Sequence, residues 1–246
     1  MATLVVPLYI TNAQCTSLLT IVNTGSAPID AVVTFWGLEG AAVGAKALSL
    51  APRSSTTVDV GDVEMVEHRF PALGSISILL PSPRADVVEG YLTITSREPG
   101  NPFSVRESLQ TTTSGGRLRV ASVPDTFSVP VIAVHSLSDS PQTILLGCTD
   151  GRGQRYETRT ALPAHTTFLL NVCIARRTEG RTYDQLLRGD AGLSKGAMRV
   201  EVKTEDGQGG ISLWGFVRSV AGKPPKGHFV ETVDFSDPRV PGEAHR

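Results

Sequence analysis

Residues 52–60 read PRSSTTVDV, and this stretch sets a pattern that recurs along the chain. A proline opens a turn, and from Thr56 to Val60 every second residue can face a protein core while the others face water. Alternation of this kind is typical of a half-buried β-strand. Residues 163–170, PAHTTFLL, give a similar turn and strand again. The sequence therefore predicts a chain built from short strands that begin after turns.

Short runs of β-branched and apolar residues recur through the 246 residues, separated by Gly, Pro, Ser, Asp and Asn, whereas helical periodicity is nearly absent. The spacing of these runs is typical of antiparallel sheets packed as a sandwich. We therefore expect an all-β fold. The clearest predicted strands are residues 18–22, 31–36, 56–60, 75–80, 87–94, 129–134, 143–146, 166–172, 197–202 and 211–217.

The two halves of the sequence resemble each other. Pro28 and Pro141 each precede a strand, a turn containing glycine, a second strand and then the proline-led strand described above. Further along, Gly74 and Gly196 each begin another strand. Self-similarity of this kind is the mark of a duplicated unit. We expect two tandem antiparallel β-sandwich domains, residues 1–112 and 113–246, which meet near the polar stretch 110–116.

The second half carries an insertion near residues 174–195 and ends in a C-terminal tail. Residues 182–185, TYDQ, match a capping box and predict one short helix that ends at Gly189. The insertion also holds Arg176, Arg177 and Arg181. We interpret these arginines either as a ligand-binding loop or as part of a solvated cap over one end of the sandwich.

Composition excludes several classes of protein. Lys and Arg number 23 against 24 Asp and Glu, and this net charge of -1 argues against a nucleic-acid binder. A hydrophobic content of 40% excludes a mainly disordered chain. No apolar run reaches the roughly 18 residues that a membrane span requires, so no membrane span is expected. The three cysteines, Cys15, Cys148 and Cys173, are too scattered for a disulfide framework or a zinc site.

The first residues, MATLVVPLYI, lack the basic segment of a secretion signal and predict a strand. This strand is expected either to pair within its own sandwich or to add to a neighbouring subunit. The protein is expected to be cytoplasmic if Met1 is the native start, or extracellular if the chain is a mature form.

Motifs that carry chemistry are missing from the sequence: it has no nucleophile elbow, Walker loop, HExxH helix or dinucleotide fingerprint. Glu64, Glu67 and His68 could hold a cation weakly, but one loop rarely supplies enough ligands. Residues 205–210, EDGQGG, favour a hairpin turn over a calcium loop. We therefore expect no catalytic residues, no cofactor and no metal site.

Two tryptophans, Trp36 and Trp214, fall in predicted strands. On an exposed sheet face they could stack on sugar rings, whereas in a core they would fill the space between the sheets. The core interpretation is favoured for both, and the sugar-binding one is kept as an alternative. The candidate interaction residues are thus Trp36, Trp214, Arg176, Arg177 and Arg181.

Turn and strand motifs in both halves resemble the immunoglobulin-like β-sandwich repeats of bacterial secreted and surface proteins. The residues that carry the resemblance are Asn23-Thr24-Gly25, the turn at residues 50–55 and the strand start at Gly74, with residues 136–141, 162–166 and 196–198 in the second half. The resemblance implies an immunoglobulin-like fold, an extracellular or cell-surface location and a role in adhesion, scaffolding or polymer assembly.

Two functions follow as hypotheses. The first is a non-enzymatic structural or interaction protein that binds a protein partner or assembles with itself through the edge strands of its sheets. The second is a carbohydrate-binding β-sandwich module that uses the strand tryptophans to hold a glycan.

Overall fold

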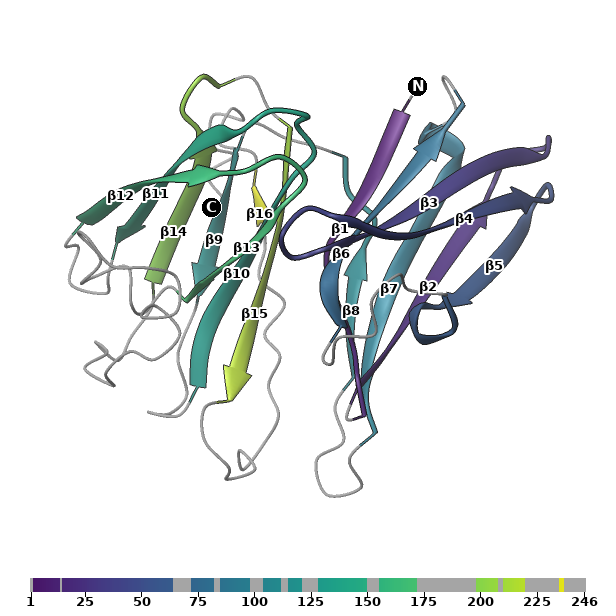
Figure 1. The fold of residues 1–246 in the computed structure, drawn as a ribbon, viewed down its shortest axis with the longest axis horizontal. Coiled ribbons are helices and arrows are strands. Elements are labelled where there is room, and N and C mark those ends of the chain that lie inside the picture. Colours follow the sequence, from purple (N-terminus) through teal and green to yellow (C-terminus); the bar gives the residue numbers. More distant parts are fainter. Residues whose placement is uncertain are drawn as a thin grey trace, which may run out of the picture. The chain divides into compact units, whose positions relative to one another are not determined.

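The computed structural model describes most of the chain, and Figure 1 shows its strands. The residues described are 2–13, 15–63, 72–81, 85–97, 104–111, 115–120, 128–149, 155–171, 198–207, 210–219 and 235–236. These residues form sixteen strands and two single-turn 3-10 helices, and the strands pair antiparallel. The predicted all-β class is therefore confirmed. The helix predicted at residues 182–189 lies outside the described residues, as does most of the insertion near residues 174–195.

Contacts divide the chain into two compact units. Unit 1 comprises Met1–Thr112 together with His165–Thr167. It contains two four-stranded sheets, with the strand orders β1-β6-β3-β4 and β5-β2-β7-β8. Its strands are β1 (Ala2–Thr11), β2 (Cys15–Asn23), β3 (Ile29–Gly37), β4 (Ala42–Leu50), β5 (Ser54–Asp59), β6 (Ala72–Leu80), β7 (Val88–Ser96) and β8 (Ser104–Ser108), and its 3-10 helices are η1 (Val60–Asp62) and η2 (Ala85–Val87).

Unit 2 comprises Thr113–Ala164 and Phe168–Arg246. Its sheets have the strand orders β12-β11-β14-β9-β16 and β13-β10-β15. Part of the stretch predicted as a polar linker is strand β9, which begins at Gly115. The strands are β9 (Gly115–Val120), β10 (Ser128–Ser136), β11 (Gln142–Thr149), β12 (Arg155–Leu162), β13 (Thr167–Asn171), β14 (Met198–Thr204), β15 (Ile211–Ser219) and β16 (Phe235–Ser236).

The two units share one strand order. The sheet β1-β6-β3-β4 corresponds strand by strand to β9-β14-β11-β12, and β5-β2-β7 corresponds to β13-β10-β15. The units differ at two edges, because β8 pairs with β7 in unit 1 whereas β16 pairs with β9 in unit 2. The repeated motifs of the sequence thus fall on strands in the same topological positions.

The turns after β4 and β12 also match in backbone conformation. Leu50 and Leu162 end these strands and are fully buried. Three residues later, Arg53 and His165 adopt positive φ angles of 51° and 53°. Residues other than glycine rarely adopt this left-handed conformation. Counted from these residues, Pro163 corresponds to Ala51 rather than to Pro52, a shift of one residue from the match that the prolines suggest.

Alternation along strands such as β3 builds much of the core of unit 1. In β3, Ile29, Ala31, Val33 and Phe35 are buried, whereas Asp30 and Val32, which alternate with the first three, are exposed. Because side chains on a strand point alternately to opposite faces, the buried set faces the other sheet. Fully burying a side chain such as Phe35 contributes about 1.5–3 kcal/mol. The other strands supply buried residues in the same way, including Leu19, Ile21, Val58, Ile76, Ile78, Leu80, Leu92 and Ile94.

Strand β1 pairs with β6 inside unit 1, so the first of the two expectations for the N-terminal strand holds in this structure. Leu4, Val6 and Tyr9 are buried. Val5 on the opposite face is buried too, and its backbone exchanges hydrogen bonds of 2.8 and 2.9 Å with the backbone of Gln110. The counterpart of β1 in unit 2 is β9.

A buried asparagine closes one end of unit 1. The Nδ2 group of Asn23, at the end of β2, donates to the carbonyl oxygens of Ala27, Leu50 and Ala51 over 2.8, 3.1 and 3.1 Å. Its Oδ1 atom accepts a hydrogen bond of 2.9 Å from the backbone N–H of Gly25. Asn23 therefore ties the β2–β3 turn to the end of β4. Because buried carbonyl groups need donors, these bonds also satisfy backbone that the turns leave without a ladder partner.

Unit 2 has Ser136 in the corresponding place. Its hydroxyl is buried, accepts from the backbone N–H of Ser138 over 3.3 Å and accepts from Nε2 of Gln142 over 2.8 Å. The bond from Ser138 repeats the one from Gly25 to Asn23, since both span two residues. A hydroxyl is shorter than an amide and carries one donor, so Ser136 cannot bind three carbonyl groups as Asn23 does.

We expect the Asn23→Ala substitution to lower the free energy of unfolding of unit 1 by about 2–4 kcal/mol, because it removes one buried and three part-buried hydrogen bonds to the backbone. Ser136→Ala should cost unit 2 about 1 kcal/mol, since fewer bonds are lost. Urea denaturation followed by circular dichroism measures both, with the exposed Ser26→Ala as a control. Equal, small effects of Asn23→Ala and Ser26→Ala would contradict this role for Asn23.

Burial of Tyr9 makes the stability of unit 1 depend on pH in the alkaline range. Its ring is buried and meets Phe35 edge to face, with 6.3 Å between ring centroids. Burial raises the pKa of Tyr9 from 10.0 to about 12. Between these two values the unfolded chain releases the phenolic proton while the folded chain keeps it. Stability from this group is therefore complete below pH 10 and decreases by roughly 1.4 kcal/mol per pH unit as the pH rises towards 12. Unfolding free energies measured across this range should decrease less steeply in Tyr9→Phe, and identical slopes would contradict the assignment.

Candidate interaction surface

Histidine and acidic residues do not gather into a metal site in the described part of the chain. His135 is buried in β10, opposite Ser212 of β15. Glu64, Glu67 and His68, considered above as a weak cation site, lie outside the described residues.

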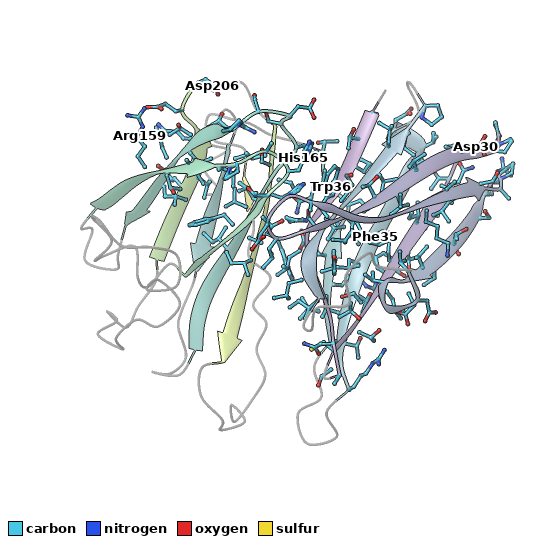
Figure 2. The ribbon with its side chains drawn as sticks, in the orientation of Figure 1. Asp30, Phe35, Trp36, Arg159, His165 and Asp206 are labelled. Atoms are coloured by element: carbon cyan, nitrogen blue, oxygen red, sulfur yellow. The ribbon has the colours of Figure 1, made fainter. Side chains whose placement is uncertain are left out.

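The described residues of the acidic stretch, 205–207 and 210, lie between β14 and β15, and residues 205–206 form a turn. The backbone N–H of Gly207 donates to the carbonyl of Thr204 over 3.2 Å, and Gly207 has a φ of 68°. The carboxylate of Glu205 pairs with the guanidinium of Arg159 on β12, and Figure 2 labels Arg159 and the neighbouring Asp206. This arrangement fits the hairpin-turn interpretation, with Glu205 engaged in an ion pair.

The two candidate tryptophans are both engaged in the fold. The indole N–H of Trp36 donates to the hydroxyl of Ser77 over 2.8 Å, and its ring stacks on His165 with centroids 4.3 Å apart and planes 9° from parallel (Figure 2). Trp214, on β15, is only 6% exposed. Trp214 is therefore not an open platform for a sugar, whereas Trp36 is half-buried and has His165 stacked on its ring. Arg176, Arg177 and Arg181 lie outside the described residues.

Strand β4 is an edge of unit 1, and among the residues that the structure describes it pairs with β3 alone (Figure 1). With nine residues, β4 is longer than two other edge strands of this unit, β5 with six residues and β8 with five. The remaining edge, β1, is bridged at Val5 by Gln110. Because an edge strand presents backbone N–H and C=O groups that no neighbour takes up, β4 can accept a further strand.

Lys46 lies in the middle of this edge. It pairs with Val33, which is buried, so its side chain lies on the core-facing side of the sheet. Lys46 is nevertheless exposed, since no strand lies beyond it in the sheet. The lysine makes no ion pair with any residue that the structure describes. Charged residues that point inward at an edge oppose pairing with apolar strands.

The outer face next to β4 carries an apolar row. Val32 and Leu79 are the exposed large hydrophobic residues of the described chain, at 43% and 40%. They lie opposite each other on β3 and β6, and Val32 also lies opposite the exposed Ala47 of β4. We call Ala47, Val32 and Leu79 the apolar row. Nothing in the local sequence distinguishes these residues as an interaction surface, although the alternation along residues 31–36 predicts that Val32 faces outward.

The outer face of the other sheet of unit 1 is rich in hydroxyl groups. Thr20 lies opposite both Thr57 and Tyr91, and the two threonine hydroxyls are 3.2 Å apart. The guanidinium of Arg106, on β8, covers the ring of Tyr91 at 4.0 Å from its centroid. Contacts of this type are cation–π interactions. We call Thr20, Thr57, Tyr91 and Arg106 the hydroxyl face.

Comparison of the sequence with protein-family models and with curated proteins, and of the fold with solved structures, found no match. Among the described residues, no helix has the length and apolar character needed to cross a membrane.

Proposed function

We propose that this protein is a non-enzymatic interaction protein that binds a protein partner, or a second copy of itself, through unit 1. The observation that carries the proposal is the position of the apolar row beside the open edge of β4. Exposed apolar side chains are common singly, but a contiguous group at a strand edge favours protein contact. The resemblance to immunoglobulin-like repeats supports an assembly or adhesion role at a bacterial cell surface, which forms part of the proposal.

A tagged chain isolated gently from its producing cell should have a mass above the 26.1 kDa of a single chain in light scattering. Leu79→Lys should reduce this mass, because it places a charge in the apolar row, whereas Thr93→Lys on the other sheet should not. In hydroxyl-radical footprinting, residues 72–81 should be labelled severalfold less in the assembly than in the purified chain. A mass of one chain with unchanged labelling would contradict the proposal.

Carbohydrate binding is the second candidate function, and the hydroxyl face is a candidate glycan site for it that does not include the tryptophans. The hydroxyl face places an aromatic ring, a guanidinium and threonine hydroxyls on one sheet surface, and such groups can bind sugar hydroxyls and ring faces. Trp214 is buried, whereas Trp36 stacks on His165 and Tyr91 lies under Arg106. The hydroxyl face is favoured because it adds threonine hydroxyls and a guanidinium to its aromatic ring.

If a glycan panel contains a ligand that binds the hydroxyl face, Tyr91→Ala should abolish its binding, while Trp36→Phe and Trp214→Phe should leave it within about twofold, because neither indole belongs to that face. Isothermal titration with the strongest glycan of the panel measures the effect. If Trp36→Phe loses binding and Tyr91→Ala keeps it, the glycan site lies at Trp36 and not on the hydroxyl face.

A further inference from the structure

We propose that the β4 edge of unit 1 accepts an extended segment of a partner protein that presents a carboxylate to Lys46 and apolar side chains to the opposite face. The inference deepens the function proposed above and rests on it. It names the kind of partner and the residue that selects it.

The two faces of β4 have different chemistry. On the outer face, Ala45 and Ala47 are exposed, and Ala47 continues into Val32 and Leu79. On the core-facing side, Lys46 is the charged residue of the strand. A strand added to β4 places its own residues alternately on these two faces, because paired residues point the same way. Its outward residues would extend the apolar row, and an inward residue would meet Lys46.

Charge complementarity decides the inward residue. An uncharged strand would cover the lysine without offering it a counter-charge, and desolvation of a charge without a partner is costly. Aspartate or glutamate at that position would supply the counter-charge. Specificity depends on the difference in binding free energy between a strand with a carboxylate at this position and a strand without one. Weak binding of the second is therefore as important as tight binding of the first.

A second copy fits this edge less well. If β4 pairs antiparallel with another β4 around a twofold axis near its centre, the two Lys46 side chains lie opposite each other or on neighbouring pairs of the same face. Like charges at such positions repel. In addition, β4 itself contains no acidic residue. We therefore assign the edge to a different protein chain.

A nine-residue probe, TVTVEVTVT with blocked ends and a fluorescent label, tests the assignment on the full chain by fluorescence anisotropy. The probe presents glutamate on one face and valines on the other. It should bind saturably, and a probe with lysine in place of glutamate should bind at least about tenfold more weakly. Lys46→Glu should reverse this preference. Lys203→Glu is the matched control, because Lys203 is exposed on β14, a strand with a neighbour on each side.

Two further measurements separate strand addition from non-specific attraction. A probe methylated on alternate backbone nitrogens should lose binding, since it cannot form the ladder. Val32→Thr together with Leu79→Thr should weaken the original probe severalfold without unfolding the chain, because both residues are exposed.

Absence of saturable binding, equal affinity for both probes, or an equal effect of Lys46→Glu and Lys203→Glu would each overturn the inference. So would a chain that dimerises through β4 and loses the dimer in Ala45→Pro. Failure of the strand-addition inference is distinguishable from failure of the proposed function. If only the inference fails, the native assembly will still depend on Leu79, but the probe will not bind.

Discussion

The two-residue period of the β-strand governs the surface of unit 1 as well as its core. Burial of Ala31, Val33 and Phe35 against the second sheet forces Val32 outward, whatever its preference for water. The same constraint on β6 turns Leu79 outward between the buried Ile78 and Leu80. Register then brings the two outward residues together. The apolar row thus results from two strands, β3 and β6, whose register cannot shift by one residue without exposing their large buried side chains.

Local patterns were sufficient to predict most of the strands but not their neighbours. The runs at residues 31–36 and 75–80 were predicted as strands from alternation and flanking glycine, and they are parts of β3 and β6. That these two strands lie side by side depends on packing between segments about forty residues apart, which a local pattern does not contain. Strand β9 was not predicted, because its local sequence does not look like a strand. Its first residues, Gly115 and Gly116, have the composition of a linker, and their place in the sheet is fixed by pairing with β14.

Candidate site residues were harder to predict than strands, because exposure depends on tertiary contacts. Trp36 and Trp214 were chosen for their residue type, but a hydrogen bond to Ser77 and a stack on His165 engage the first, and burial engages the second. Lys46, in contrast, belongs to a residue type that is common on any surface. Its position becomes informative only when the register places it opposite a buried valine at the edge of a sheet.

The left-handed corner shared by Arg53 and His165 bears on how relatives of this unit can be recognised. The corner carries arginine in unit 1 and histidine in unit 2, and the preceding proline differs by one position, yet both residues adopt the same left-handed φ. The bend is therefore shared where the residues are not. A search for further chains with this unit should begin from the buried leucine and the bend three positions after it, in preference to the interchangeable valines and threonines of the strands.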